Sequence, residues 1–126
     1  MIYLGIGSNL GDRKINIEKA KFKIFQNNIK ILQSSNYYES LSWPNNDNPK
    51  FLNIVIKIKT DLNPNKLINL CKEIERSFGK RKEERNSPRM CDIDIIDYKN
   101  KQSNKGVILP HPRLDYRSFV LLPLFE

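Results

Sequence analysis

The 126-residue chain has little of what zinc sites and disulfide frameworks require: two cysteines, one histidine and one tryptophan. Cys71 and Cys91 have no spacing typical of a zinc site and read as small core residues, and a three-histidine metal site is impossible with His111 alone. No apolar stretch approaches ~20 residues, which excludes a transmembrane helix, and no signal-peptide pattern precedes the first predicted strand. These absences predict a soluble, cytoplasmic protein.

Two common nucleotide-binding loops are also absent. Gly5, Gly7 and Gly11 are similar to the glycine pattern of dinucleotide-binding folds, but that pattern needs a glycine where the chain has Leu10. The Gly-Lys-Ser/Thr sequence of a P-loop does not occur. The glycines instead favour a tight turn and a close backbone contact at the end of the first strand.

The chain is basic, since 22 Lys and Arg residues against 14 Asp and Glu residues give a formal net charge of +8. This charge favours anionic partners, and both nucleic acid and nucleotide phosphates qualify. The densest basic cluster consists of Lys80, Arg81, Lys82, Arg85 and Arg89. Next to acidic residues the cluster suits phosphate binding, although a run of charge is also typical of ordinary solvated surface.

The length fits one domain over residues 1–126, and hydrophobic periodicity divides that domain into elements. In order these are a strand over residues 1–7, a helix capped by Asp12, strands over 29–41 and 51–60, a helix from Asn63 to a stop at Gly79, and a strand over 87–97. This order is that of a split βαβ arrangement. It predicts an α+β, ferredoxin-like fold with a mainly antiparallel sheet and helices packed on it.

Asp92 and Asp94 interrupt the last apolar run. Because strand side chains alternate, both carboxylates are expected on one face and the isoleucines between them on the other, with about 6 to 7 Å between the two Cα atoms. Such a pair can hold hard divalent cations. A solvated strand face is the alternative, but aspartate is depleted in strands and like charges at this spacing need compensation by a metal or by basic residues.

Three further residues suit a ligand, and each has a structural alternative. His111 stands between Pro110 and Pro112, which suits a ring held to hydrogen-bond a ligand, although a lone histidine is more often structural. Phe51 and Asn53 begin a strand, and a flat heterocycle could stack on the ring and pair with the amide. Core packing of Phe51 is equally compatible with the sequence.

Several segments of the chain occur together, and in this order, in one known family. They are Gly-Ile-Gly-Ser-Asn-Leu-Gly at 5–11, Phe-Leu-Asn at 51–53, Pro-Arg at 88–89, Asp-Ile-Asp-Ile at 92–95, Leu-Pro-His-Pro-Arg at 109–113 and Arg-Ser-Phe at 117–119. Together they span nearly the whole chain. The chain resembles the 6-hydroxymethyl-7,8-dihydropterin pyrophosphokinases of folate biosynthesis.

The resemblance implies transfer of the pyrophosphoryl group of ATP to the hydroxymethyl oxygen of the reduced pterin, with release of AMP. It implies that Asp92 and Asp94 hold two magnesium ions, an arrangement that stabilises the attacking and leaving oxygens. The residues implied on the nucleotide side are Glu75, Arg89, Ile95, His111 and Arg117. Lys80 and Lys82 are implied as catalytic residues, with Arg89 and the aspartates, in a mobile loop that closes over the triphosphate.

For the pterin, the resemblance implies a sandwich between Phe51 and Phe119. Asn53 and Ser40 are implied to read the polar edge of the ring, with Leu41 beside them. The expected partners are therefore two small molecules, ATP and the hydroxymethyldihydropterin, with no nucleic acid and no membrane. The protein is expected to be a monomer.

The chain departs from the family pattern at Lys80 and Lys82, where arginines are common, and at Asn86 and Ser87, where an aromatic residue and a glycine are frequent. Lysine keeps the charge and loses the bidentate fork, so a lower nucleotide affinity is expected. A small RNA-binding module is the alternative function; it would expose aromatic residues on central strands and no acidic pair. An inactive homologue is a third possibility, disfavoured because the charged site residues are present.

Overall fold

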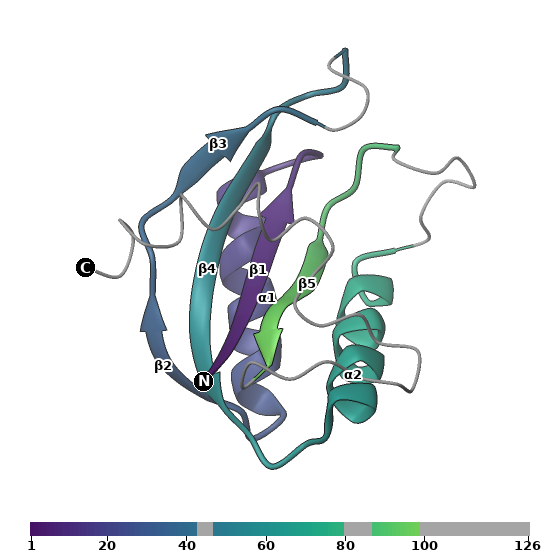
Figure 1. Ribbon diagram of the computed structural model, residues 1–126. Coiled ribbons are helices and arrows are strands. Elements are labelled where there is room, and N and C mark those ends of the chain that lie inside the picture. Colours follow the sequence, from purple (N-terminus) through teal and green to yellow (C-terminus); the bar gives the residue numbers. More distant parts are fainter. Residues whose placement is uncertain (43–46, 80–86, 99–126) are drawn as a thin grey trace.

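The computed structural model describes residues 1–42, 47–79 and 87–98. Along these residues lie β1 (Ile2–Ser8), α1 (Arg13–Gln26), β2 (Lys30–Ser34), β3 (Tyr38–Ser40), β4 (Phe51–Lys59), α2 (Pro64–Arg76) and β5 (Asp92–Tyr98). The strands form one sheet in the order β2-β4-β1-β5, with β3 paired to the start of β4, and every pairing is antiparallel. α1 lies behind β1 and β4, and α2 lies beside β5 (Figure 1). The predicted α+β fold with a mainly antiparallel sheet is confirmed.

Local capping signals place the starts of both described helices. Asp12 caps α1, and its side chain accepts a hydrogen bond from the Ile15 N–H at 3.1 Å. Asn63 caps α2 in the same way, accepting from the Lys66 N–H at 2.9 Å. A cap of this kind contributes about 1 kcal/mol. After α2 the chain turns through Gly79, whose φ of 115° lies in the region that favours glycine.

One face of the sheet forms the hydrophobic core. Leu4, at the centre of β1, is fully buried and stands opposite Ile56 of β4 and Ile95 of β5. The helices contribute Ile17, Ala20, Ile24, Leu67, Cys71 and Ile74. Cys91 belongs to the same cluster and both thiols are unpaired, so the prediction that the cysteines are core residues is confirmed.

The single strand predicted over residues 29–41 is wrong, because the chain forms two strands there. Between β2 and β3, Ser35 is buried. It pairs with Val55 of β4 through one backbone hydrogen bond and one side-chain hydrogen bond. Its N–H donates to the Val55 carbonyl oxygen at 2.9 Å, and its Oγ accepts from the Val55 N–H at 2.8 Å. A serine hydroxyl thus replaces a backbone carbonyl, and this cross-strand bond coincides with the break between β2 and β3.

β5 carries a bulge near its end. The register pairs Leu4 with Ile95 but Tyr3 with Asp97, which leaves Ile96 as an extra residue. Ile95 and Ile96 are consequently both buried. The predicted alternation of side chains holds over the residues before the bulge, which include both aspartates.

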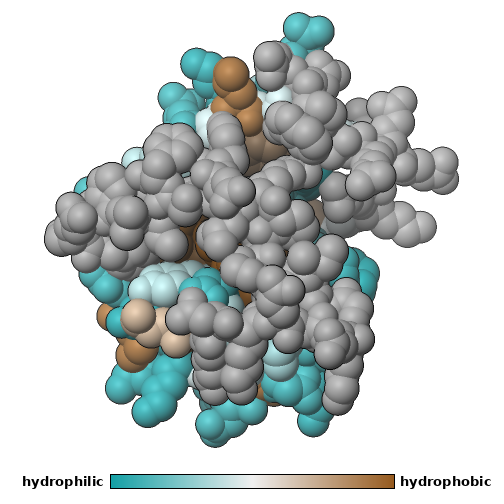
Figure 2. All heavy atoms as spheres, viewed as in Figure 1, coloured by the Kyte–Doolittle hydropathy of each residue, from teal (hydrophilic) through white to brown (hydrophobic). Residues whose placement is uncertain are grey.

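The surface of the described residues carries both hydrophilic and apolar side chains (Figure 2). Seen from the same side as Figure 1, hydrophilic side chains gather along its lower edge, where the chain turns from β4 to α2 (Figure 2). None of the described helices is both long and apolar enough to span a membrane.

Candidate active site

The sheet face opposite the core brings several of the predicted site residues together. Gly5 and Gly7 of β1 lie on this face, and the antiparallel register places Asp94 beside Gly5 and Asp92 beside Gly7 on β5. On the other side of β1, Asn53 of β4 stands next to Gly7. The two carboxylates therefore share one face, as predicted, and Asn53 lies across β1 from Asp92.

Gly7 allows the close packing of β1 against β4 at this site. A Cβ atom at this position would lie 2.9 Å from Asn53 Oδ1 and 3.2 Å from Phe51 Cδ1. Both distances are shorter than normal van der Waals contact. The predicted close contact at the end of the first strand is confirmed, and the missing side chain is what lets Phe51 and Asn53 lie against β1.

Arg89 links the acidic strand to the aromatic ring. Its Nε lies 3.3 Å from Asp92 Oδ1, and the two side chains are only 11% and 18% exposed. Its Nη2 donates to Asp92 Oδ2 at 3.4 Å, and the guanidinium carbon lies 5.2 Å from the centre of the Phe51 ring. The basic compensation that the paired aspartates require is therefore provided in part by Arg89, which also makes a cation–π contact.

Two polar atoms next to this ion pair are buried without a hydrogen bond. Among the described residues, these are Ser87 Oγ and Arg89 Nε, whose approach to Asp92 lacks hydrogen-bond geometry. Buried polar groups are normally hydrogen-bonded, and an exception is notable at a site that binds polar ligands. Arg89 Nε therefore interacts with Asp92 through charge and not through a well-formed hydrogen bond.

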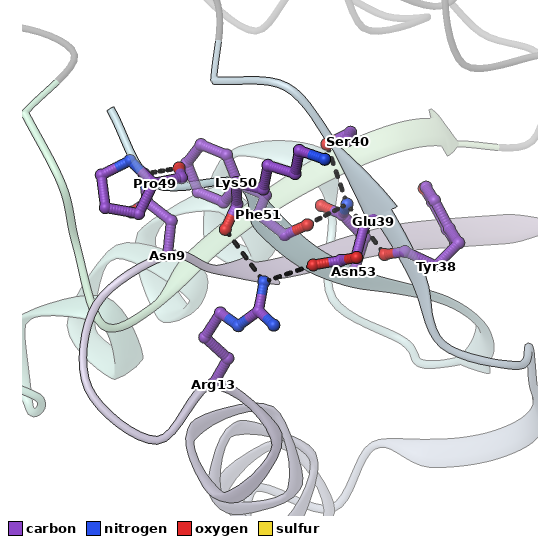
Figure 3. A network of polar contacts seen from close by, with 9 residues as sticks. All are labelled: Asn9, Arg13, Tyr38, Glu39, Ser40, Pro49, Lys50, Phe51 and Asn53. Atoms are coloured by element: carbon purple, nitrogen blue, oxygen red, sulfur yellow. Dashed lines mark hydrogen bonds and ion pairs between the residues drawn. The ribbon is translucent and has the colours of Figure 1, made fainter. Parts of the chain in front are cut away.

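Asn53 and Ser40 form a polar pair at the other end of the site (Figure 3). Asn53 Nδ2 donates to Ser40 Oγ at 2.9 Å and to the Tyr38 carbonyl oxygen at 3.2 Å. These bonds fix the amide with its Oδ1 towards Gly7. Leu41, which follows β3, has a side chain that is 52% exposed.

Glu75 of α2 closes the outer edge of β5. Its Oε2 accepts a hydrogen bond from the Ile93 N–H at 2.7 Å, which gives a partner to a backbone group on the edge strand. Burial, together with the negative charges of Asp92 and Asp94, raises the pKa of Glu75 to about 7, against the opposing effect of the Ile93 N–H. A carboxyl that titrates near neutral pH therefore lies next to β5, the strand that carries Asp92 and Asp94.

A cavity of about 550 Å³ opens between the end of α2 and the start of β5. Its charged lining residues are Lys72, Glu75, Arg76 and Arg89. Three of these four side chains are basic, so the cavity suits an anionic ligand. Glu75 and Arg89, both predicted on the nucleotide side, thus line one cavity.

The donor set for a metal ion is small in the described part of the chain. No group of three or more His, Cys, Asp or Glu residues is clustered there. Asp92 and Asp94 offer hard carboxylate oxygens on one face, which is the chemistry that Mg²⁺ prefers. They fit an ion that takes its remaining ligands from water and substrate phosphates.

Some predicted residues are placed elsewhere, or lie outside the described ranges. The side chain of Ile95 is in the core and 3% exposed, so only its backbone could contact a nucleotide. Lys80, Lys82, His111, Arg117 and Phe119 lie outside the described residues.

Asn9 and Arg13 join the site although the sequence assigned them no role. Asn9 lies in a segment that carries the family resemblance, which was the available signal. Arg13 donates from Nη1 to Glu39 Oε2 at 2.9 Å and to the Lys50 carbonyl oxygen at 3.1 Å, and so ties α1 to β3 and to the residue before β4 (Figure 3).

The fold and the site define an α+β domain suited to phosphoryl transfer, with paired carboxylates and a largely buried arginine next to an aromatic ring and an amide. The chain belongs to the 7,8-dihydro-6-hydroxymethylpterin-pyrophosphokinase family, whose model matches residues 3–126. The predicted family, and with it the predicted enzyme class, is confirmed.

Named relatives support this assignment. The 2-amino-4-hydroxy-6-hydroxymethyldihydropteridine pyrophosphokinase of Aquifex aeolicus (strain VF5) is 39% identical over 126 residues, which cover 99% of the chain and 78% of that protein. The protein of the same name from Bacillus subtilis (strain 168) is 36% identical over 98% of the chain and 75% of its own length. Folic acid synthesis protein fol1 of Pneumocystis carinii is 40% identical over 99% of the chain, which spans only 17% of fol1.

Proposed function

We propose that the chain transfers the pyrophosphoryl group of ATP to the hydroxymethyl oxygen of 6-hydroxymethyl-7,8-dihydropterin, giving the pterin diphosphate and AMP. The observation that carries this proposal is the register on the sheet face opposite the core, where Asn53 of β4 and Asp92 of β5 flank Gly7 of β1. A heterocycle held at β4 would direct its substituent across the glycine towards the carboxylates. Family membership supports the same reaction.

The proposed reaction is an in-line displacement at phosphorus. The hydroxymethyl oxygen forms a bond to the β-phosphorus of ATP, the bond from that phosphorus to the oxygen bridging the α-phosphate breaks, and AMP leaves with the bonding electrons. The hydroxyl proton passes to solvent. Reactions of this kind depend chiefly on positioning and on neutralisation of charge.

The pterin is proposed to bind at the start of β4. Phe51 offers a ring for stacking, and Phe119 is proposed as the second wall of the sandwich. Because the Asn53 amide nitrogen is engaged with Ser40, its Oδ1 is the atom oriented to accept from a ring N–H. Leu41 is proposed to line the same site.

The triphosphate is proposed to lie along β5 and the cavity beside α2. Asp92 and Asp94 are the proposed ligands of two Mg²⁺ ions, which when bound neutralise phosphate charge. Arg89, already in contact with Asp92, is proposed to bind a phosphate oxygen through its fork of donors. The other proposed nucleotide-side or catalytic residues are Glu75, Lys80, Lys82, Ile95, His111 and Arg117.

The organisation of the enzyme is proposed to be simple. We propose a monomer with one domain over residues 1–126. The unpaired, buried thiols of Cys71 and Cys91 are typical of a reducing compartment and support a cytoplasmic location. Light scattering of the purified protein with both substrates tests the monomer.

The decisive experiment is a product assay with the purified chain, Mg-ATP and the hydroxymethyldihydropterin. We expect AMP and the pterin diphosphate in equal amounts, and no AMP when the pterin is left out. Formation of ADP in place of AMP would reject the proposed pyrophosphoryl transfer.

A matched pair of aspartate variants tests the metal ligands. Asp94→Asn should reduce turnover by about 100-fold or more, because a neutral amide cannot replace an anionic ligand to a hard cation. Asp97→Asn is the control, since Asp97 lies on the same strand beyond the bulge and pairs with Tyr3. Equal activity of the two variants would remove Asp94 from the proposed metal site.

The RNA-binding alternative fits the sheet face opposite the core poorly. RNA-binding sheets present aromatic side chains on central strands, and Phe51 of β4 could serve as one, but the carboxylates of Asp94 and Asp92 beside Gly5 and Gly7 would repel phosphate. Salt-sensitive, magnesium-independent RNA binding in a gel-shift titration would favour the alternative.

A further inference from the structure

Asn9 is a buried polar residue between the Arg89 segment and the start of β4, the two parts of the proposed site. It follows Ser8, the last residue of β1, and only 2% of its surface is exposed. Buried asparagines are rare unless their hydrogen bonds are satisfied. Those bonds lead to two segments that are remote in the sequence.

The first segment is the backbone of Arg89. Asn9 Oδ1 accepts a hydrogen bond from the Arg89 N–H at 2.8 Å, and the Asn9 N–H donates to the Arg89 carbonyl oxygen at 3.1 Å. Both backbone polar groups of Arg89 are thus held by one residue. From this fixed backbone the guanidinium reaches Asp92 and the Phe51 ring.

The second segment is the chain that leads into β4. Asn9 Nδ2 donates to the Pro49 carbonyl oxygen at 3.1 Å (Figure 3). Pro49 precedes Phe51, the first residue of β4, by two positions. The side-chain amide of Asn9 therefore binds the Arg89 backbone through its oxygen, and the Pro49 carbonyl next to β4 through its nitrogen.

The turn that carries Asn9 is itself held from behind by α1. Asn16, which is 4% exposed, donates from Nδ2 to the Leu10 carbonyl oxygen at 2.8 Å and to Ser8 Oγ at 3.2 Å. The residues on either side of Asn9 are therefore anchored to the helix. The hydrogen bonds of Asn9 to Arg89 and Pro49 therefore start from a turn that Asn16 of α1 holds in place.

We propose that Asn9 is a positioning residue that sets the spacing between the pterin-binding start of β4 and the phosphate-binding Arg89. The proposal rests on the function proposed above, and Asn9 acts through Pro49 and Arg89 without touching either substrate. Because each binding site keeps its own residues when Asn9 is replaced, the main loss is the alignment of the attacking oxygen with the phosphorus. A misplacement of about 1 Å can lower a rate about 100-fold.

Two variants distinguish the side-chain hydrogen bond to the Arg89 N–H from the one to the Pro49 carbonyl oxygen. Asn9→Ala removes both side-chain bonds, whereas Asn9→Asp keeps the acceptor for the Arg89 N–H and loses the donor to the Pro49 oxygen. Asn63→Ala is the matched control, because it also removes an asparagine side-chain bond, at the N-cap of α2. Each protein is assayed for kcat, for binary affinity towards the pterin and towards a non-hydrolysable Mg-ATP analogue, for melting temperature, and for hydrogen exchange of the Arg89 amide.

We expect kcat to fall about 10- to 100-fold in both Asn9 variants, with each binary affinity within about threefold of wild type. The Arg89 amide should exchange faster in Asn9→Ala and as in wild type in Asn9→Asp. Asn63→Ala should lower the melting temperature and leave kcat per folded molecule unchanged.

Three results would overturn the inference: a wild-type kcat in the Asn9 variants, a fall in melting temperature as the whole effect, or a loss confined to the affinity for one substrate. An inactive wild-type chain would overturn the proposed function itself, and the positioning role of Asn9 with it. An active wild type with unaltered variants would overturn the positioning role alone.

Discussion

Glu75 shows at the scale of one residue how burial sets charge near the site. Its pKa is about 7 in the folded protein against an ordinary value of 4.5, and burial is the largest cause. The folded state therefore binds this proton more strongly than the unfolded state does. The stabilising contribution of the protonated group is complete below about pH 4.5 and is lost as the pH rises through about 7.

Glu75→Gln should remove this pH dependence in the protein without magnesium or substrates. The amide oxygen can still accept from the Ile93 N–H, so the bond at the edge of β5 is kept. We expect the variant to exceed wild type in stability by about 1 to 2 kcal/mol at about pH 8.5, allowing for partial exposure, and to show little difference at about pH 4.5. Urea unfolding at both pH values measures the effect, and an unchanged difference across this range would contradict the raised pKa.

Gly7 gives a second prediction at the residue scale. Gly7→Ala brings a methyl group to 2.9 Å from Asn53 Oδ1 and 3.2 Å from Phe51 Cδ1, so these two residues, proposed to bind the pterin, must shift. We expect pterin affinity to fall about tenfold and the unfolding free energy to fall by about 1 to 3 kcal/mol, with nucleotide affinity nearly unchanged. Calorimetric titration with each substrate separates these effects.

The control for Gly7 is a packing change on the other face of β4. Ile58→Val shortens a core side chain that is 2% exposed and should cost about 0.5 to 1.5 kcal/mol of stability. It leaves the sheet face opposite the core intact, so its pterin affinity should equal that of wild type. An equal loss of affinity in both variants would mean that general destabilisation explains the Gly7 result.

At the scale of secondary structure, Ser35 decides how β2 and β3 share one edge of β4. Ser35→Ala deletes the Oγ that accepts from the Val55 N–H and leaves that buried donor without its acceptor. The unfolding free energy should fall by about 1 to 3 kcal/mol. Ser34→Ala is the matched control, because Ser34 is exposed and, among the described residues, its hydroxyl accepts from Lys21 Nζ at 3.3 Å. Denaturant unfolding that finds equal losses would show that the Val55 bond is not what holds this edge.

The elements that could be predicted from the sequence are those set by neighbouring residues. Asp12 and Asn63 each bond an N–H three positions further on, so the starts of α1 and α2 were visible in the sequence. The break at Ser35 depends on Val55, and the extra residue Ile96 depends on the register with β1. A single-sequence pattern contains neither partner, because each is chosen by the assembled sheet.

The site residues also divide into those predictable from neighbouring residues and those that depend on distant partners. Asp92 and Asp94 were placed on one face correctly because strand alternation is local, and their position beside Gly7 and Gly5 then follows from the register. Asn9 had no assigned role because its side-chain partners are 40 and 80 positions away. A residue that acts by joining distant segments is recognised only when those segments are seen together.

At the scale of the whole molecule, a net charge of +8 should govern how the two substrates arrive. ATP is an anion and the pterin is uncharged, while the cavity beside α2 is lined by Lys72, Arg76 and Arg89. Raising the ionic strength from about 0.05 M to about 0.5 M shortens the screening length from roughly 14 Å to roughly 4 Å. We therefore expect the ATP association rate to fall about tenfold or more over this range, with pterin binding changed less than about twofold.

Adenosine is the control ligand for this experiment, because it carries the same base and sugar without phosphate. Stopped-flow measurements with ATP, adenosine and the pterin at each salt concentration separate charge from shape. If the basic residues of the cavity attract the phosphates, only the association rate of ATP responds to salt. Replacing Lys72 by glutamine should then reduce the salt dependence of ATP association, because one cavity charge is removed. An equal response of ATP and adenosine would show that the cavity binds the nucleoside and that the net charge has no part in recruiting the donor.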